Sequence, residues 1–345
     1  MSTIRDVARR ANVSTMTVSR VVNRKGYVRP ETQRRVEAAI AELGYVPNTL
    51  ARSLRFKRTK TLALVLTDIT NPFFTTLARG VEDVASDQGF NVIFCITDES
   101  EREQTQYLTV LVQKQVDGVL LVPATSSAAP IDFLQQHGIP VVVLDRRVPA
   151  ARVDIVRCDS QGAACTLTNH LLALGHRRIA LLSGPAEVST ASDRVAGFRQ
   201  AFGEAGLAPA EELILLGGYT VESGRQMAEQ ALAAGERPTA VFAANNFIAI
   251  GAYQALRNAG FSVPADLSLV SFDDLAPTVG LDPFLTVVTQ PADQMGRCAT
   301  ELLLRRLTQN GDGAPEEVLL PTALIVRRST APRAPLLLHR HDGVV

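Results

Sequence analysis

The sequence lacks the long apolar segments that membrane proteins need. No run approaches the roughly 18 apolar residues that span a bilayer as a helix, and the first residues contain no apolar stretch of the kind that forms a secretory signal. The four cysteines are scattered without a C-x-x-C pair, and three of them lie inside apolar runs, which is typical of small core residues. We therefore expect a cytoplasmic protein that does not contact membranes.

The motifs of common enzymes are also missing. No G-x-G-x-x-G follows the apolar run at 62–66, and the chain has no P-loop, no G-x-S-x-G and no H-E-x-x-H. His170 and His176 lie on and just beyond a predicted helix, where a lone histidine is typical of a cap or a surface residue. Asp145 and Asp273 could form the carboxylate pair of a glycoside hydrolase, which is the one enzyme alternative that these residues suggest. We predict no catalytic residue, no metal and no cofactor.

The charges of the chain are unevenly distributed. Thirty-five Lys and Arg balance thirty-five Asp and Glu, so the formal net charge is zero. Residues 1–60, however, contain fourteen basic and four acidic residues, a net charge of +10, and the remainder therefore carries −10. A basic segment joined to an acidic body indicates a polyanionic partner for that segment alone.

The first 46 residues predict three short helices. Thr3, with Asp6 three residues later, can form the capping box of a helix that runs to residue 11. Ser14 can cap a second helix over Thr15–Val22, and a third is expected from about residue 31 to 43. Two short helices, a tight turn and a third helix form a helix-turn-helix. Residues 1–46 are therefore predicted to be a DNA-binding head.

The second helix suits the major groove of DNA. Arg20 can donate bidentately to guanine and Met16 can contact a thymine methyl group, whereas hydroxyls and the other basic side chains suit phosphates. A small helical bundle with solvated charges would show the same spacing, and the net charge of +10 favours DNA over that alternative.

The first 54 residues contain a series of specific motifs. They are Thr3-Ile4-Arg5-Asp6-Val7-Ala8, Val13-Ser14, Thr17-Val18-Ser19-Arg20-Val21-Val22-Asn23, Pro30-Glu31-Thr32, Leu43-Gly44-Tyr45, Pro47-Asn48 and Ala51-Arg52-Ser53-Leu54. Together they resemble the headpiece signature of the lactose/galactose repressor family. Arg29 departs from it, because a small capping residue is expected before Pro30. From the residues and the resemblance we predict a DNA-binding set of Thr3, Ser14, Thr15, Met16, Thr17, Ser19, Arg20, Asn23, Lys25, Arg29, Ala51, Leu54 and Arg55.

Residues 47–60 are predicted to be a hinge helix and linker. Asn48 can cap a helix of about nine residues, in which Leu50 and Leu54 lie one turn apart. A helix this short is marginal alone in water and needs a partner to form. The family resemblance implies that this stretch is the hinge helix and that Leu54 is inserted into the minor groove at the operator centre, where such wedges kink DNA.

From residue 61 the pattern changes to short apolar runs that alternate with helix-length segments. Eight such runs, the first at 62–66 and the last at 267–270, predict parallel strands covered by helices on both faces. They are too many for one compact sheet, so we predict an effector-binding and dimerisation domain over 61–328 with two doubly wound lobes, one at about 61–157 and 290–320 and the other at about 158–289 and 321–328. The predicted fold class is α/β, with the helix-turn-helix head, two parallel-sheet lobes and a flexible tail over 329–345.

Polar residues follow many of the predicted strands. In doubly wound folds, ligands bind beyond the carboxyl ends of the strands, and six of these ends are followed by carboxylates, amides, guanidinium groups or hydroxyls. An Asp at one strand end alone is more simply explained as a helix cap. The convergence of six ends favours a pocket for a neutral polyol such as a sugar, because such groups form paired hydrogen bonds with hydroxyls.

Residues 61–328 resemble the ribose-binding-protein-like core, a periplasmic-binding-protein-like fold that these repressors share. The resemblance implies a ligand-binding set of Asn71, Phe73, Phe74, Asp145, Arg146, Arg194, Asn245, Phe272, Asp273 and Gln290. The set favours a ribose-like pentose. Asn246 departs from the Asp that is usual beside the pocket Asn, and the departure removes one charge.

These features predict a transcription repressor whose operator affinity is controlled by a small ligand, most simply a sugar, bound between the lobes. A helix-turn-helix head normally contacts two half-sites, so we expect a homodimer on a pseudo-palindromic double-stranded DNA operator. No a/d heptad in the tail supports a tetramerising coiled coil. The alternatives are a sugar-binding transport component, which the basic head argues against, and a sugar-active enzyme, which the missing nucleophile and base motifs argue against.

Overall fold

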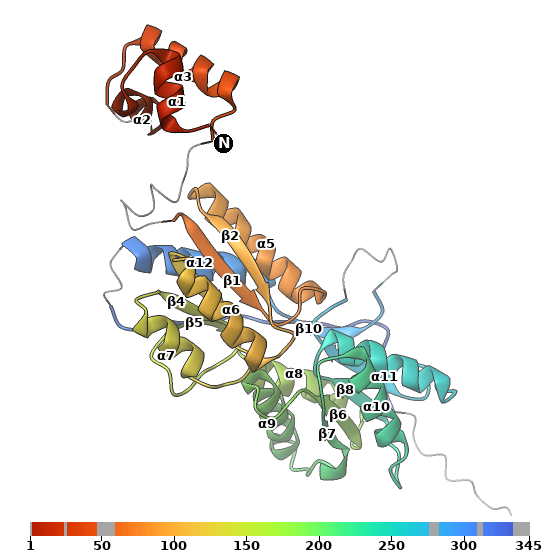
Figure 1. Cartoon of the computed structure of the whole chain (residues 1–345). Coiled ribbons are helices and arrows are strands. Elements are labelled where there is room, and N and C mark those ends of the chain that lie inside the picture. The colour runs from red at the N-terminus through yellow and green to blue at the C-terminus, as the bar shows by residue number, and fades with distance from the viewer. Residues whose placement is uncertain (1, 24–25, 47–58, 276–282, 309–312, 334–345) are drawn as a thin grey trace, which may run out of the picture. The chain divides into compact units, whose positions relative to one another are not determined.

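The computed structural model describes residues 2–23, 26–46, 59–275, 283–308 and 313–333 (Figure 1). The chain forms two compact units, Met1–Thr59 and Lys60–Val345. No helix within the described ranges is long and apolar enough to cross a membrane.

The first unit contains three helices, α1 (Ile4–Ala11), α2 (Thr15–Asn23) and α3 (Pro30–Leu43). The predicted capping box is confirmed, because the Asp6 N–H donates to Thr3 Oγ1 and the Thr3 N–H donates to the Asp6 carboxylate at 2.9 Å. Small apolar side chains from all three helices, among them the fully buried Val18 and Val36, form the core. The predicted helix-turn-helix is present.

The second unit contains two six-stranded sheets, and each sheet belongs to one lobe. The first sheet has the order β11-β5-β4-β3-β1-β2, and all its pairs are parallel. Its strands are β1 (Thr61–Leu66), β2 (Asn91–Ile96), β3 (Gly118–Leu121), β4 (Val141–Leu144), β5 (Asp154–Cys158) and β11 (Glu317–Leu320). Its helices are α5 (Pro72–Asp87), α6 (Glu101–Gln113), α7 (Ala129–Gln136) and α12 (Ala292–Thr308).

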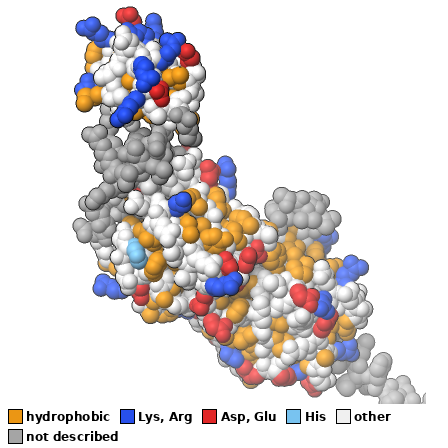
Figure 2. Space-filling model, viewed as in Figure 1, with side chains coloured by type: hydrophobic (Ala, Val, Ile, Leu, Met, Phe, Trp, Pro, Cys, Tyr) orange, Lys and Arg blue, Asp and Glu red, His pale blue; other side chains and the backbone are white. Residues whose placement is uncertain are grey.

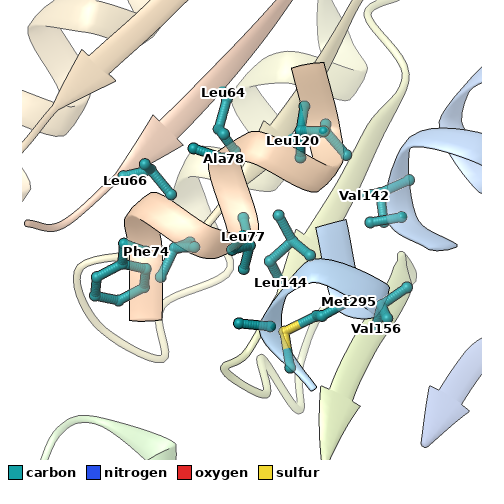
Figure 3. Packing of buried hydrophobic residues seen from close by; sticks show 14 of the residues in the cluster. Leu64, Leu66, Phe74, Leu77, Ala78, Leu120, Val142, Leu144, Val156 and Met295 are labelled. Atoms are coloured by element: carbon teal, nitrogen blue, oxygen red, sulfur yellow. The ribbon is translucent and has the colours of Figure 1, made fainter. Parts of the chain in front are cut away.

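Helices cover both faces of the first sheet. On one face α5 and α12 pack against the strands, and Figure 3 shows Leu77 of α5 and Met295 of α12 beside Leu144 of β4. On the other face α6 and α7 contribute a second apolar cluster. A parallel sheet buried on both faces needs apolar side chains at nearly every strand position, which explains the continuous apolar runs in the sequence.

The second sheet has the order β12-β10-β9-β8-β6-β7, and only the β10–β12 pair is antiparallel. Its strands are β6 (Ile179–Ser183), β7 (Ile214–Leu216), β8 (Ala240–Ala243), β9 (Ser268–Phe272), β10 (Thr286–Thr289) and β12 (Ala323–Ile325). Its helices are α8 (Ser160–Ala173), α9 (Ser189–Glu204), α10 (Val221–Leu232) and α11 (Asn246–Asn258), with a 3₁₀ turn η1 at Glu211–Leu213. Helices α8 and α9 cover one face, and α10 and α11 cover the other.

Each of the eight predicted apolar runs forms a strand, and the strand end predicted before Gln290 is that of β10. The additional strands β5, β11 and β12 have mixed burial: β5 alternates buried and half-buried positions, and the edge strands β11 and β12 are largely exposed. Strands of this kind do not need continuous apolar residues, which explains why the apolar runs did not reveal them. The chain passes between the two sheets three times, after β5, after β10 and between β11 and β12.

The prediction of a flexible tail from residue 329 is wrong for residues 329–333. Ser329 is fully buried against Leu269 of β9: its hydroxyl donates to the Leu269 carbonyl at 2.5 Å, and its carbonyl accepts from the Leu269 N–H at 2.9 Å. Its Oγ also accepts a hydrogen bond from the Thr286 N–H at 2.7 Å. The Ala331 carbonyl meets Nε2 of the buried His176 at 3.1 Å. The polar backbone of this segment therefore completes the second lobe, a role that its Pro- and Ser-containing composition did not reveal. Residues 334–345 lie outside the described ranges.

Glycines permit close helix packing in both lobes, and Gly251 of α11 shows the effect best. A Cβ at Gly251 would lie 1.9 Å from the Val221 carbonyl oxygen at the start of α10. Replacing glycine by alanine in an open helix usually stabilises it by about 1 kcal/mol. Here the two helices would have to separate, and we expect Gly251→Ala to lower the free energy of unfolding by about 1–3 kcal/mol.

Urea denaturation of the purified protein measures this effect, and Gly203→Ala in α9 is the matched control. A Cβ at Gly203 would meet no atom within 4 Å, so the control should be unchanged or slightly more stable. Equal stability of both variants would show that the α10–α11 contact tolerates a methyl group.

Candidate functional site

The carboxyl ends of the strands in both lobes border one cleft in the second unit. The cavity encloses about 180 Å³. Its lining residues are Thr67, Asp68, Asn71, Phe73, Phe74, Asp98, Glu99, Asp145, Arg146, Thr190, Arg194, Tyr219, Thr220, Asn245, Asp273 and Gln290. Nine of the ten residues that the sequence predicts as the ligand-binding set are among them.

Phe272 is the one predicted residue that does not line the cavity. Its side chain is fully buried in the core of the second lobe. The guanidinium carbon of Arg194 lies 3.7 Å from the centroid of its ring. The Phe272 ring therefore packs against the guanidinium group of Arg194 and does not line the cavity.

Two of the predicted residues also have a local structural role. Asn71 caps α5, because its Oδ1 accepts a hydrogen bond from the Phe73 N–H at 3.0 Å. Asn245 caps α11, because its Oδ1 accepts from the Ile248 N–H at 2.7 Å. Their presence in the cleft is thus partly explained by helix capping.

Helix capping does not explain the two aspartates at the strand ends. Asp145 follows β4 with φ 64°, and Asp273 follows β9 with φ 63°. A left-handed backbone is unfavourable for a residue other than glycine and is concentrated at functional sites. Both carboxylates occupy matching positions in their lobes and line the cleft.

The two arginines are held rigidly. Arg146 donates to both Glu99 oxygens at 2.6 Å and to the Pro123 carbonyl at 2.7 Å. Arg194 donates to the Ala244 carbonyl at 2.5 Å. Both are almost completely buried, with exposures of 2% and 4%, so neither side chain must lose much conformational entropy when a ligand binds.

Several polar atoms at the cleft have no hydrogen-bond partner among the described residues. On the lining residues they are Thr67 Oγ1, Asp145 Oδ1, Arg146 Nε, Arg194 Nε and Gln290 Oε1. Buried polar groups are normally paired, so these atoms are available to bind a ligand or water in the cleft. The set contains two charged donors, two acceptors and one hydroxyl, which suits a molecule with several hydroxyl groups.

Burial shifts the acidity of both aspartates. It raises the pKa of Asp145, an effect that Arg146 and Arg194 oppose. It raises the pKa of Asp273 to about 6, although Arg194 and the Gln290 side chain, which donates at 3.0 Å, oppose it. Because the folded pKa of Asp273 lies above the usual value of about 3.9, its contribution to stability falls as the pH rises from about 4 to about 6.

Ligand binding should show the opposite pH dependence. The ionised Asp273 accepts hydrogen bonds from ligand hydroxyls better than the protonated form does. We expect the affinity for a bound sugar to fall by up to about tenfold for each pH unit below 6. Calorimetric titrations between pH 5 and 8 measure this, with Asp132→Asn on the exposed face of α7 as the control. A flat profile would show that the ligand does not use the Asp273 carboxylate.

The prediction did not include seven lining residues. Thr67, Asp68, Asp98 and Glu99 follow β1 and β2, so the same strand-end pattern marks them. Thr190 lies one helical turn before Arg194 on α9. Tyr219 and Thr220 follow β7, a short edge strand that carries no polar signal of its own.

In the first unit, α2 exposes part of its predicted DNA-contacting face. Thr15, Met16 and Arg20 are exposed, Met16 to 66%. Other predicted residues form local bonds: Ser14 Oγ accepts from the Thr17 N–H at 3.1 Å, and Asn23 Nδ2 donates to the Ser19 carbonyl at 2.7 Å. Figure 2 shows Lys and Arg side chains over the visible face of this unit.

The remaining predicted DNA-binding residues are Thr3, Arg29, Lys25, Ala51, Leu54 and Arg55. Thr3 caps α1. Arg29 is exposed at the start of α3 and its side chain makes no capping hydrogen bond, as expected for an arginine in place of a small capping residue. Lys25, Ala51, Leu54 and Arg55, like the predicted hinge helix, lie outside the described residues. Within the described ranges, no cluster of three or more His, Cys, Asp or Glu side chains is arranged to hold a metal ion.

A helix-turn-helix unit followed by two parallel-sheet lobes around a polar cleft defines a transcription regulator with a ligand-binding domain. The chain belongs to the LacI family of bacterial regulatory proteins. Residues 3–48 match the family model of bacterial regulatory proteins of the lacI family, and residues 59–328 match that of periplasmic binding proteins and the sugar binding domain of the LacI family. The resemblance found in the sequence is confirmed.

Individual relatives agree over nearly the whole chain. The ribose operon repressor of Halalkalibacterium halodurans is 39% identical, over 96% of this chain and 97% of that protein. The transcriptional regulator DegA of Bacillus subtilis is 37% identical, over 96% of this chain and 98% of that protein. The structure of the lac repressor dimer bound to operator and the anti-inducer ONPF is 28% identical, with a TM-score of 0.83 over 96% of this chain and 99% of that one.

Proposed function

We propose that this protein is a repressor that binds a pseudo-palindromic DNA operator as a homodimer and whose operator affinity changes when a small neutral sugar binds in the cleft. The observation that carries the proposal is the cluster of unpaired donors and acceptors on rigid, buried side chains from both lobes. A ligand that contacts both lobes favours one lobe angle, and this shifts the population of the DNA-binding form.

The size and chemistry of the cleft favour a monosaccharide, with a ribose-like pentose first. A cavity of about 180 Å³ is smaller than the roughly 300–1,000 Å³ of sites for drug-sized ligands. Asp145 and Asp273 offer carboxylate oxygens to paired hydroxyls, and the rings of Phe73 and Phe74 offer apolar surface for a sugar ring. The relative named as a ribose operon repressor supports the same class of ligand.

Two DNA-contacting elements are proposed for each subunit. Met16 and Arg20 of α2 would contact base edges in the major groove. Ala51, Leu54 and Arg55 would contact the centre of the operator, where Leu54 would be the minor-groove wedge. The dimer follows from this arrangement, because one helix-turn-helix contacts only one half-site.

A thermal-shift screen of the full chain against pentoses, hexoses, sugar acids and nucleosides tests the proposal. A ligand that binds only the folded state raises the melting temperature. The best pentose or hexose is then added to the protein on operator DNA, and product analysis of the same mixture tests for turnover. We expect a shift in melting temperature, a change in operator affinity and unchanged sugar. A sugar that is chemically converted would instead favour the enzyme alternative.

A further inference from the structure

Two asparagine side chains join the lobes beside the cleft. Asn71 caps α5 of the first lobe, and Asn246 is the first residue of α11 in the second lobe. Asn71 Nδ2 donates to Asn246 Oδ1 at 3.1 Å, and Asn246 Nδ2 donates to Asn71 Oδ1 at 3.0 Å. The exposures of the two side chains are 6% and 0%. This reciprocal amide pair forms only when the two lobes are at this separation.

Neighbouring backbone groups determine which way each amide points. Asn71 Oδ1 also accepts from the Phe73 N–H, and Asn246 Oδ1 also accepts from the Phe247 N–H at 2.8 Å. Because an N–H can only donate, these contacts identify the oxygen of each amide and leave each Nδ2 to donate. Asn246 Nδ2 makes a further bond to the Asp274 carbonyl at 3.2 Å.

A carboxylate at position 246 would not complete this pair. An aspartate has the same shape but no N–H, so its second oxygen would face Asn71 Oδ1 and the Asp274 carbonyl, which are both acceptors. Two hydrogen bonds would be replaced by repulsion between lone pairs in a buried place. Separation of the lobes would relieve it, because all these groups could then bind water.

We propose that Asn246 is a positioning residue that selects, through Asn71, the arrangement of the lobes in this structure, here called closed, and that this selection requires an amide at position 246. Asn71 lines the cleft, so the pair connects a ligand-facing side chain directly to the second lobe. A ligand that needs both lobes binds to the arrangement that the pair selects. That closure serves ligand binding rests on the proposed function. The closure itself can be measured without sugar or DNA.

Another contact joins the lobes through Arg147, and it differs in kind. The Arg147 N–H donates to Ser189 Oγ at 2.7 Å, and its guanidinium pairs with Asp193. The Arg147 side chain is 36% exposed, so water screens the ion pair and reduces its contribution. The buried asparagine pair is therefore the more sensitive determinant of closure.

The distance between the lobes tests the proposal in the sugar-free full chain. Spin labels are placed at Gln136 of α7 and Gln230 of α10, both exposed, by chemistry that does not use thiols, because Cys298 is partly exposed. Pulsed electron paramagnetic resonance compares the wild type, Asn246→Asp and the control Asn258→Asp. The control adds the same charge at an exposed position of the same helix.

We expect the wild type and Asn258→Asp to share one short distance, and Asn246→Asp to shift to longer distances. Replacement of the Asn246 Nδ2–Asn71 Oδ1 bond between the lobes by repulsion between two acceptors should lower the ratio of closed to open molecules by about 10–100-fold. Identical distance distributions in Asn246→Asp and the wild type would overturn the proposal.

Melting temperatures separate this effect from general damage to the second lobe. A negative charge at residue 246 lies at the N-terminus of α11, where it is favourable for the helix dipole, whereas a charge at residue 258 lies at its unfavourable end. Asn246→Asp should therefore melt no lower than Asn258→Asp while its lobes are further apart. If Asn246→Asp does not fold, Asn246→Ser provides the test, and wild-type distances in that variant overturn the proposal.

Binding of D-ribose is measured separately on the same three proteins. Failure of D-ribose to bind the wild type would count against the proposed pentose and leave the distance result standing. A normal dissociation rate for D-ribose in Asn246→Asp, together with wild-type distances, would count against the positioning role alone.

Discussion

Arg194→Ala is expected to abolish the response to sugar while leaving operator binding without sugar nearly intact. The side chain is 4% exposed, bonded to the Ala244 carbonyl and stacked on Phe272, and its Nε has no partner within the described part of the chain. A hydrogen bond to a charged group is worth about 1.5–3 kcal/mol. Loss of that bond alone lowers ligand affinity by roughly 10–100-fold.

The neighbouring carboxylates increase the loss. Arg194 lowers the pKa of both Asp145 and Asp273 against the effect of burial. Without its positive charge both carboxyl groups bind protons more readily and become poorer acceptors for hydroxyls. We therefore expect the affinity for the sugar to fall by more than about 100-fold in total. A higher sugar concentration should then not restore the response.

Calorimetry with the best sugar measures the ligand affinity, and an operator-binding assay with and without that sugar measures the operator affinity and its response. Arg199→Ala is the matched control, because Arg199 lies on the same helix but is half-exposed and pairs with Glu211. The control should respond normally. A normal sugar response in Arg194→Ala would remove Arg194 from the site.

Arg20→Ala is expected to weaken specific operator binding by about 10–100-fold, because a bidentate contact to guanine is worth about 1–3 kcal/mol of discrimination. Arg20 lies in the last turn of α2 and is exposed, beside the exposed Met16 one turn earlier. Val18, between them in sequence, is fully buried and anchors the helix against the rest of the unit. The substitution should therefore not unfold the head.

Fluorescence anisotropy with an operator duplex and a scrambled duplex, at several salt concentrations, separates the possible roles. Arg34→Ala in α3 removes the same charge from another exposed position. Arg34→Ala should slightly weaken binding to both duplexes, because it removes part of the electrostatic attraction to phosphates that salt suppresses. Equal losses on the two duplexes in Arg20→Ala would mean that Arg20 contacts phosphates and not bases.

The parts of the structure that depend on neighbouring residues were predictable. The capping box of Thr3 and Asp6 involves residues three positions apart, and it forms as the sequence indicates. The buried central strands also follow from the sequence, because burial on two faces demands continuous apolar residues. Edge strands such as β11 were missed, since water on one side removes that demand.

Within the cleft, the strand-end pattern located residues but not their partners. It marked Asp145 and Arg146, and the structure shows that Glu99, 47 positions away, holds Arg146 in place. The family resemblance placed Phe272 in the ligand set, and the structure places its ring under Arg194 and not on the cavity. Neither arrangement has a local signal, because it depends on how two elements pack.

The sequence by itself determined a basic helix-turn-helix head, an α/β body and a set of polar residues at strand ends. Periodicity, capping and charge act over a few residues, so they are legible in the chain. Only the tertiary structure decided which of these residues meet. Asn71 and Asn246 are 175 positions apart in the sequence. Their side chains meet because the carboxyl ends of the parallel strands in the two lobes face one cleft.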